Sequence, residues 1–312
     1  MIILVGAGPM AQAYAHVLKS LEKEFTVIGR GKESAAEFYS KTGVEAVPGG
    51  LEKFLSGHSV SNVQAAIVTT GVEQLHHTTE LLLNVGVRRF LVEKPAGLDG
   101  DDIRSLAEKV QKANADVFVA YNRRFYSSVQ AAKQLIEEDG GPLSFNFELT
   151  EWGHVIQNIP KAPGVKDNWF LGNTTHVADL AFFLGGKPKE ISTFTSGSSD
   201  WHSRSYNFSG AGVAESGALF SYNGNWGAPG RWRVEILTQK RRFIFSPLEK
   251  LQVQNLGSVQ QDFVEIDDKI DTDFKAGLYE QTRAFLTDDL QDLCDLKEHC
   301  ELLNKYEMMA GY

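Results

Sequence analysis

The sequence has few cysteines, no long apolar run and no excess of positive charge. Its 312 residues contain two cysteines, Cys294 and Cys300, so no disulfide framework is expected and both thiols are expected to be reduced. The apolar start, Met1–Val5, is too short for a secretory leader, and no apolar run approaches the ~20 residues of a membrane span. A net charge of -9 and a sequence pI of about 5.4 leave no basic stripe for a nucleic-acid backbone. These absences predict a cytoplasmic protein that binds neither membranes nor nucleic acids.

A glycine-rich turn follows the first apolar run directly. Residues 6–11, Gly-Ala-Gly-Pro-Met-Ala, come after the predicted strand Ile2–Val5 and open a helix-like stretch. In this context Gly6 permits the tight turn, Gly8 lets the backbone approach a pyrophosphate, and Ala11 keeps the helix close to the sheet. The N–H groups and the dipole of the helix start then favour phosphate. The order of strand, glycine turn and helix predicts a dinucleotide-binding fold.

Short β-rich runs alternate with helical stretches over the first ~120 residues, which is the pattern of a parallel sheet covered on both faces. The expected strands are Ile2–Val5, Phe25–Gly29, Ala65–Thr69, Arg89–Val92 and Val117–Tyr121, with a weaker candidate at Gly43–Ala46. The expected helices are Ala11–Leu21, Ser34–Lys41, Asp101–Ala113 and, beyond the last of these strands, Ser127–Glu138.

Beyond Pro142 the pattern changes to period-two alternation, which predicts a mainly antiparallel sheet with one face on a core. The expected strands are Ser144–Leu149, Ile191–Thr195, Ser205–Phe208, Ala218–Tyr222, Arg231–Leu237 and Arg242–Phe245, and the expected helices are His176–Leu184, Tyr279–Leu290 and Leu296–Met309. The predicted fold class is α/β, with a Rossmann-type doubly wound parallel sheet at residues 1–122 and an α+β domain with a large open sheet at residues 123–312. The second face of that open sheet predicts a homodimer or homotetramer.

The end of the second strand lacks the acidic residue that binds the adenosine ribose hydroxyls in NAD-specific sites. Gly29 and Arg30 stand there, and Lys32 and Ser34 follow closely. A small residue removes charge repulsion, and a guanidinium has the fork that suits a 2′-phosphate. The pattern therefore favours NADP over NAD, against the alternative of a solvated basic turn.

Polar groups also end the third and fourth strands. The segment Val68–Gly71 lies at the edge expected over the cofactor, and His76 begins the next helix, where a cofactor contact and a surface position are equally supported. Lys94, within Glu-Lys-Pro, is placed to donate a hydrogen bond or a proton to an oxygen near a nicotinamide, and Glu93 to hold its ammonium. No metal is expected, because His76 and His77 have no acidic or cysteine partner at ligand spacing.

Four motifs in this order resemble the glucose–fructose oxidoreductase / inositol dehydrogenase (Gfo/Idh/MocA) family, over essentially the whole chain. They are Gly6-x-Gly8-x-x-Ala11, Glu93-Lys94-Pro95, Tyr121-Asn122-Arg123-Arg124-Phe125 and His176-x-x-Asp179. The resemblance implies NAD(P)-dependent oxidation or reduction at a hydroxyl or carbonyl carbon of sugars, cyclitols or nucleotide sugars. It also implies that Lys94 lies by the nicotinamide and the reacting oxygen, that a cis peptide precedes Pro95, and that His176 is a general acid or base.

The chain departs from the family pattern just before this histidine. Family members commonly have an aspartate four residues earlier, in Asp-x-Gly-x-His, whereas this chain has Gly172 there and Asn173 beside it. His176 and Asp179 are three residues apart and are expected on one helix face, so a histidine paired with its own aspartate is the structural alternative.

Two aromatic segments are candidates for contact with a sugar. The loop between Glu151 and Trp169 is rich in Trp, His, Lys and Asn and is expected to act as a substrate lid, with interdomain packing as the alternative for Trp169. The tripeptide at 231–233, Arg-Trp-Arg, is expected on a strand, with the indole on one face and solvated or subunit-facing arginines on the other.

These arguments give a set of expected site residues. The catalytic residues are Lys94 and His176. The cofactor-binding residues are Gly6, Gly8, Pro9, Met10, Ala11, Gly29, Arg30, Lys32, Thr69, Thr70, Gly71, His76, Glu93, Lys94 and Asn122. The substrate residues are Lys94, Tyr121, Arg123, Trp152, Asn173, His176 and Asp179. The leading hypothesis is an oxidoreductase that uses NADP(H) rather than NAD(H) on a sugar-like substrate. The alternatives are a redox-neutral sugar-modifying enzyme with tightly bound cofactor, or a non-catalytic NADP(H)-binding sensor.

Overall fold

The computed structural model describes the whole chain, Met1–Tyr312, and divides it into two compact units. Unit 1 contains Met1–Asn122 and Asp271–Glu301, and unit 2 contains Arg123–Ile270 and Leu302–Tyr312. The expected second domain, residues 123–312, is therefore too long, because Asp271–Glu301 folds with unit 1. No helix combines the length and the apolar character that crossing a membrane requires.

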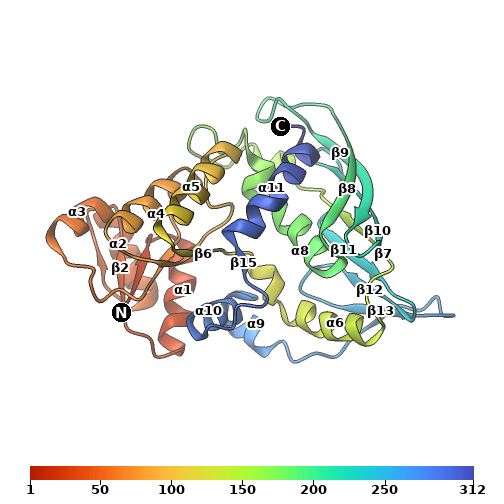
Figure 1. Cartoon of the computed structure of the whole chain (residues 1–312), viewed down its shortest axis with the longest axis horizontal. Helices are drawn as coiled ribbons and strands as arrows, with labels where there is room; N and C mark the ends of the chain where they lie inside the picture. Colours follow the sequence, from red (N-terminus) through yellow and green to blue (C-terminus); the bar gives the residue numbers. More distant parts are fainter. The chain divides into compact units, whose positions relative to one another are not determined.

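Unit 1 is built on a seven-stranded sheet in the order β15-β6-β5-β4-β1-β2-β3 (Figure 1). Its strands are β1 Ile2–Val5, β2 Phe25–Ile28, β3 Ala46–Val47, β4 Ala65–Val68, β5 Arg89–Val92, β6 Asp116–Val119 and β15 Cys294–Asp295. Strands β1 to β6 pair in parallel, whereas β15 joins β6 antiparallel. Every residue of β1 and β4 is buried, as expected of central parallel strands that are covered on both faces.

Helices connect these strands and enclose the sheet. They are α1 Pro9–Ser20, α2 Lys32–Thr42, α3 Leu51–Gly57, η1 Val72–Gln74, α4 Leu75–Asn84, α5 Gly100–Ala113 and α10 Leu278–Thr287. Three further elements contain residues of both units, namely η2 Asn122–Phe125, α9 Lys269–Asp273 and α11 Leu296–Ala310. Helix α10 packs on α1, and β15 pairs with β6. These two contacts explain why Asp271–Glu301 belongs to unit 1.

The weaker strand candidate of unit 1 is displaced in the structure. It was expected at Gly43–Ala46, but β3 contains only Ala46 and Val47. Gly43 instead ends α2 in the left-handed conformation, with φ of 68°, which glycine adopts without steric cost. The end of α2 at Gly43 therefore lies where the sequence predicted the start of a strand.

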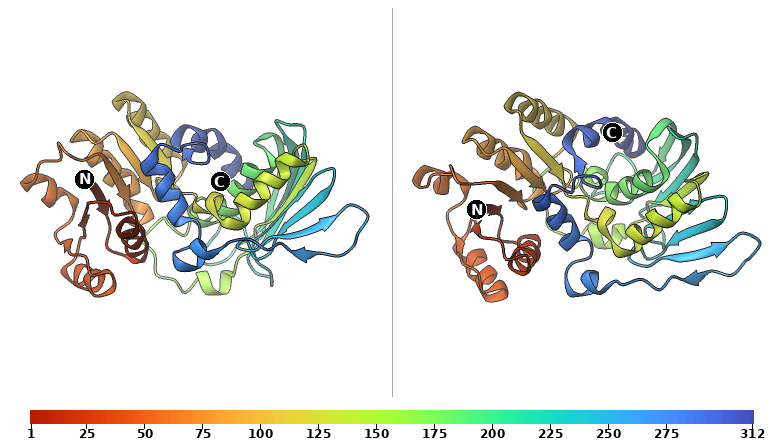
Figure 2. Two further views of the ribbon diagram at one scale, coloured as in Figure 1. Left: turned by 90° about the horizontal axis from the view of Figure 1, so that it is seen from below. Right: turned by 60° about the horizontal axis from the view of Figure 1, so that its bottom comes forward.

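Unit 2 is built on an eight-stranded sheet in the order β14-β13-β12-β11-β7-β10-β9-β8. Its strands are β7 Ser144–Glu148, β8 Pro188–Ser196, β9 Asn207–Ala214, β10 Leu219–Asn225, β11 Arg233–Leu237, β12 Arg241–Phe245, β13 Gln252–Asn255 and β14 Asp262–Phe263. Neighbouring strands are antiparallel except β7 and β10, which are parallel. Its helices are α6 Ser127–Glu138, α7 Gly153–Ile156, the π-helix η3 Phe170–Thr174 and α8 Thr175–Gly185. Helices α6 and α8 lie on one face of the sheet (Figure 2).

Aromatic rings fill the space between α8 and this sheet. Phe182 of α8 lies edge-on to Phe147 and Phe220, with ring centroids 5.5 Å from each. Gly185 lets the end of α8 approach closely, because a Cβ there would lie 2.5 Å from Phe145 Cγ. The helix that carries His176 is therefore packed tightly on a rigid sheet.

The other sheet face exposes apolar side chains in unit 2. Exposed and buried residues alternate along β10, and its exposed set begins with Leu219 at 61% exposure. Phe194 of β8 is 72% exposed. This alternation confirms the expected one-sided core of a mainly antiparallel sheet.

Candidate functional site

The carboxyl ends of β1 and β4 approach each other at Gly6. This residue has φ of 126°, and a Cβ there would lie 2.9 Å from the carbonyl oxygen of Thr69. Gly8 is the N-cap residue of α1 and supplies no side-chain cap, and a Cβ on it would meet nothing within 4 Å. The N-terminus of α1 therefore opens onto space that is free of protein atoms, which suits a phosphate group.

The end of β4 offers a second feature that fits a cofactor. The Thr69 hydroxyl donates to the carbonyl oxygen of Val5 at 3.0 Å, whereas Thr70 Oγ1 is buried without a hydrogen-bond partner. Buried polar atoms are nearly always satisfied, so this hydroxyl is suited to a polar group that binds at the same edge. Together with Gly6 and Gly8, these residues fit a dinucleotide.

The predicted 2′-phosphate segment lies at the end of β2. A Cβ on Gly29 would lie 3.1 Å from the Cβ of Ala7, so the small residue allows the glycine turn and this strand end to pack together. Arg30 and Lys32 are both exposed, and Lys32 begins α2. Two exposed cations are thus available at the end of β2, and the first carboxylate after them is Glu33, in the first turn of α2.

Glu93, at the end of β5, belongs to a polar chain that reaches across unit 1. Its Oε1 accepts from the hydroxyl of the fully buried Tyr14 at 3.3 Å. The amide of Gln281 lies 3.4 Å from the same hydroxyl, and in its satisfied orientation its oxygen accepts from the backbone N–H groups of Asn122 and Tyr121 at 3.1 and 3.2 Å. Burial raises the pKa of Glu93, and the positive charge of the adjacent lysine opposes that rise.

Two residues of this hydrogen-bonded network, Tyr14 and Gln281, could not be identified from the sequence. Tyr14 follows the glycine turn on α1 and reads as an ordinary core residue, and Gln281 lies far along the sequence on α10. The tripeptide that begins with Glu93 has the implied cis peptide between Lys94 and Pro95. The structure thus builds the base of the lysine loop from three distant segments.

Three predicted residues of unit 1 make contacts within its helices and core. His76 lies between α4 and α5, where Nδ1 bonds to the carboxylate of Asp102 and Nε2 is 3.0 Å from Lys109 Nζ. Tyr121 was expected to contact substrate, but its ring is buried and its hydroxyl lies 3.4 Å from His299 Nδ1. Asn122 donates through Nδ2 to the carbonyl oxygen of Ala276 at 2.9 Å. These contacts explain the positions of the three side chains, and no bound ligand is needed for that explanation.

In unit 2, His176 is the second residue of α8 and follows the π-helix η3 directly. Its imidazole is largely buried, and the ring centroid lies 6.2 Å from that of Trp232. Single π-turns are rare and occur frequently at functional sites. The backbone before His176 therefore has an unusual conformation that local contacts must hold in place.

Glu151 provides those contacts and was missed among the predicted site residues. Its carboxylate is buried and accepts from Trp169 Nε1 at 3.0 Å, from Asn173 Nδ2 at 2.6 Å and from Thr174 Oγ1 at 2.5 Å. Burial raises the pKa of Glu151, and the three hydrogen bonds oppose that rise. The amide of Asn173, predicted to bind substrate, is thus used to hold the π-turn. The sequence signal was a carboxylate two residues after the predicted strand Ser144–Leu149, at the start of the expected lid loop.

Asp179, the other predicted residue of α8, is part of a buried ion pair. Arg124 donates to it through Nε at 2.9 Å and through Nη2 at 2.5 Å. The exposure of the two side chains is 3% and 1%. A bidentate pair without solvent access fixes α8 to the segment Asn122–Phe125, and this role accounts for the His-x-x-Asp spacing.

A line of alternating cations and aromatic rings lies beside His176. The guanidinium of Arg123 is 4.8 Å from the centroid of Trp232, and that of Arg231 is 4.6 Å from the same ring. Arg231 also lies 5.4 Å from the ring of Trp152, whose Nε1 donates to the carbonyl oxygen of Gly230 at 3.0 Å. The expectation that residues 231–233 share a strand is wrong, because β11 begins at residue 233 and the first two residues lie in the preceding loop.

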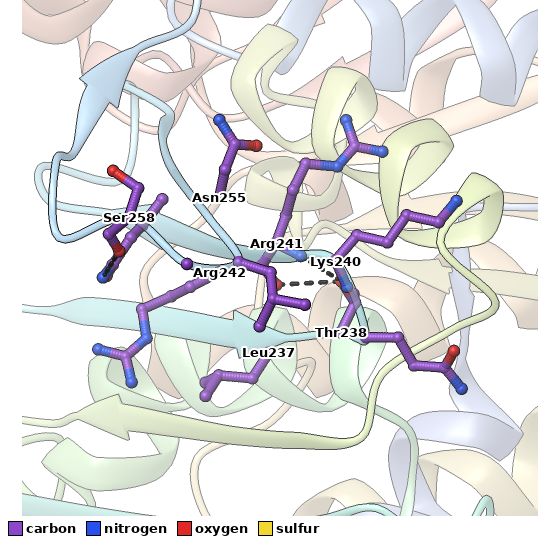
Figure 3. Close-up of a pocket in the computed structure, with 11 residues that line it drawn as sticks. Leu237, Thr238, Lys240, Arg241, Arg242, Asn255 and Ser258 are labelled. Carbon is purple, nitrogen blue, oxygen red and sulfur yellow. Dashed lines mark hydrogen bonds between the residues drawn. The ribbon is translucent and has the colours of Figure 1, made fainter.

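A cavity of about 200 Å³ in unit 2 lies apart from all of these residues (Figure 3). It is formed by the ends of β11, β12 and β13, and none of the predicted site residues lines it. Its cations are already used, because Asp139 accepts from Arg241 Nη2 at 2.7 Å and lies 3.7 Å from Lys240 Nζ. The chain contains no group of three or more His, Cys, Asp or Glu side chains placed to hold a metal ion.

Comparisons with known proteins agree with this geometry. Residues 1–121 match the family described as "Oxidoreductase family, NAD-binding Rossmann fold", GFO_IDH_MocA. The resemblance to the Gfo/Idh/MocA oxidoreductases is thus confirmed for residues 1–121. The matched residues include the glycine turn and the lysine loop of unit 1.

Two curated relatives and one solved structure illustrate the similarity. Trans-1,2-dihydrobenzene-1,2-diol dehydrogenase of Mus musculus is 25% identical over 163 residues, 51% of this chain and 47% of that protein. Myo-inositol 2-dehydrogenase of Thermotoga maritima is 22% identical over 199 residues, 60% of this chain and 55% of that protein. The chain thus spans about half the length of these relatives. A levoglucosan dehydrogenase in complex with NADH and L-sorbose shares the fold with a TM-score of 0.76 at 17% identity, covering 99% of this chain and 95% of that one.

The buried pair on α8 predicts a large loss of stability when one partner is removed. Asp179→Asn leaves the Arg124 guanidinium buried beside a neutral amide, and the expected cost is about 3–5 kcal/mol in the free energy of unfolding. Urea denaturation followed by circular dichroism measures it. Asp101→Asn, which removes an exposed pair with Arg104, is the control and should leave the midpoint nearly unchanged. A shift for Asp179→Asn as small as that of the control would contradict the assignment.

Proposed function

We propose that the protein is an NAD(P)-dependent oxidoreductase that acts at a hydroxyl or carbonyl carbon of a sugar, cyclitol or nucleotide sugar. The observation that carries the proposal is the shared edge of the unit 1 sheet. Strands β1, β4 and β5 are neighbours, and their carboxyl ends place Gly8, Thr70 and Lys94 on one side of the unit. The match to an oxidoreductase family and the dehydrogenase names of the relatives support the same chemistry.

The proposal gives each functional side chain a task. Lys94 donates a hydrogen bond to the reacting oxygen and thereby polarises the carbonyl or stabilises the alkoxide, while Glu93 and Tyr14 hold the lysine loop. His176 accepts the hydroxyl proton during oxidation and returns it during reduction. When bound, the nicotinamide supplies the hydride transfer itself. The packing of α8 and the hydrogen bonds of Glu151 keep the imidazole in place.

Replacement of either predicted catalytic residue should lower turnover by about 10²–10⁴-fold, the usual contribution of a positioned acid or base. Lys94→Ala and His176→Ala are compared with the unchanged protein on a panel of sugars, inositols, sugar phosphates and nucleotide sugars, in both directions, by absorbance of reduced nicotinamide. His176→Ala should bind cofactor normally. Turnover that is unchanged in both single variants would refute the assignment.

We propose further that NADPH binds more tightly than NADH. The end of β2 carries Gly29 and Arg30 in place of an acid, and Lys32 adds a second exposed cation. Arg30→Ala should weaken NADPH binding by about 1.5–3 kcal/mol, the worth of a charge-assisted hydrogen bond, and should spare NADH. Fluorescence titration with both cofactors measures this. Equal affinities in the unchanged protein, or an equal loss for both cofactors in the variant, would refute it.

We also propose that a second copy of the chain covers the open face of the unit 2 sheet. Phe194 and Leu219 lie exposed on this face, and apolar side chains of this size are usually covered in a stable assembly. Light scattering at micromolar concentration should show a dimer or tetramer, and Phe194→Asp should shift it to smaller species. The exposed Tyr39→Asp of α2 in unit 1 is the control. A monomer in the unchanged protein would contradict the proposal.

A further inference from the structure

Two arginines beside His176 lack an anionic partner in the folded chain. Neither Arg123 nor Arg231 makes an ion pair or a hydrogen bond through its guanidinium. Arg123 Nε is buried and has no acceptor. An arginine usually finds a carboxylate, a phosphate or a carbonyl oxygen when it leaves solvent, because its five N–H donors are costly to desolvate. Arg123 has left solvent at Nε without such a partner and therefore needs a separate explanation, whereas Arg231, on the same indole, is exposed.

The acidic residues near them do not neutralise this pair. Glu151 is buried, and its carboxylate already accepts hydrogen bonds from Trp169, Asn173 and Thr174. Burial lowers the pKa of Arg123, the positive charge of Arg231 adds to this effect, and Glu249 and Glu151 oppose it. Neither glutamate lies within ion-pair distance of the two guanidiniums. The region around them is therefore positive, although the whole chain carries a net charge of -9.

The aromatic rings give this positive region a fixed shape. Trp232 lies within 5 Å of both guanidinium carbons, and Trp152 is anchored by its hydrogen bond to the carbonyl oxygen of Gly230. Stacking on an indole holds a guanidinium by its face and leaves the N–H groups at its edge for a ligand. Trp232 also contacts the imidazole of His176, so the cations and the proposed acid–base residue share one neighbour.

We propose that the substrate carries an anionic group, a carboxylate or a phosphate, which Arg123 and Arg231 bind while the sugar ring lies at Trp152 and Trp232. This inference rests on the proposed function, because it takes His176 to mark the reacting carbon. It narrows the substrate class from sugars and cyclitols in general to sugar acids, sugar phosphates or nucleotide sugars. A neutral sugar would leave both guanidiniums without a partner at the site.

The test measures binding rather than turnover. Isothermal titration calorimetry in low salt with saturating NADP⁺ compares D-glucose, D-glucuronate and D-glucose 6-phosphate. At least one anionic probe should bind about 10-fold or more tightly than D-glucose. Arg123→Gln and Arg231→Gln should each reduce that preference by about 10- to 100-fold, the worth of a charge-assisted hydrogen bond, and should leave the affinity for D-glucose nearly unchanged. The probe that binds more tightly tells a carboxylate from a phosphate.

A matched control separates anion binding from loss of surface charge. Arg204 is exposed, stacks on the ring of Tyr312 at 4.7 Å and makes no ion pair, so Arg204→Gln removes a similar stacked cation elsewhere in unit 2. It should keep the anion preference. Arg231→Lys keeps the charge and should retain more of the preference than Arg231→Gln. Thermal melts verify that each variant folds, and Arg231 is exposed, so its replacement leaves the core intact.

Several outcomes would overturn the inference. The first is equal binding of the anionic probes and D-glucose, and the second is no binding of any of the three. The third is a full anion preference in both arginine variants. Failure of the proposed function is a different result. In that case the anionic probes would bind in an arginine-dependent way, but no compound of the panel would exchange hydride in a Lys94-dependent way. Conversely, Lys94-dependent oxidation of neutral sugars without anion preference would refute this inference alone.

Discussion

Strands β1 and β4 lie so close at their carboxyl ends that position 6 has no room for a side chain. This contact between backbones requires Gly6, and the turn that it permits directs the start of α1 over the edge of the sheet. Parallel strands all end at one edge, so the same constraint brings the uncapped amides of α1, the Thr70 hydroxyl and the Lys94 loop to one side of unit 1. The features that suit a dinucleotide follow from this one close approach.

In unit 2 a buried carboxylate has the corresponding organising role. Removing Glu151 from water is costly unless strong donors replace the lost hydration, and its donors come from the short segment Trp169–Thr174. A segment that must present an indole N–H, an amide and a hydroxyl to one carboxylate cannot vary its backbone freely. The π-turn before His176 is the conformation that meets this demand. The position of the imidazole thus depends on an acid that is distant from it in sequence.

Hydrophobic periodicity predicted most strands of both sheets but missed three short ones, β13, β14 and β15. Continuous apolar runs such as Ile2–Val5 identified the doubly covered parallel strands, and alternation such as Ser144–Leu149 identified the one-sided sheet. The errors arose where another local rule acts. Gly43 was assigned to a strand but ends the helix α2. Residues 231–232 were assigned to a strand but belong to the loop before β11, which begins at Arg233.

The motifs of the candidate site could be found from local sequence, whereas the tertiary contacts that hold them could not. The glycine turn, the Glu-Lys-Pro segment and the helix of His176 are contiguous motifs. The hydrogen bond between Tyr14 and Glu93, the amide of Gln281 and the donors of Glu151 join segments that are far apart, and no periodicity records such contacts. Asp179 shows the same limit, because nothing in the sequence indicated its ion pair with Arg124.

Net charge and local charge have different consequences in this chain. The overall charge of -9 describes the whole chain, and it says nothing about the local region that contains the guanidiniums of Arg123 and Arg231. Gly172 stands where the family commonly has an aspartate, so the segment before His176 lacks that negative charge. The carboxylate of Glu151 remains nearby, but it is engaged by three hydrogen-bond donors. Arg123 and Arg231 therefore remain as two cations on the indole of Trp232, whose ring also contacts the imidazole of His176.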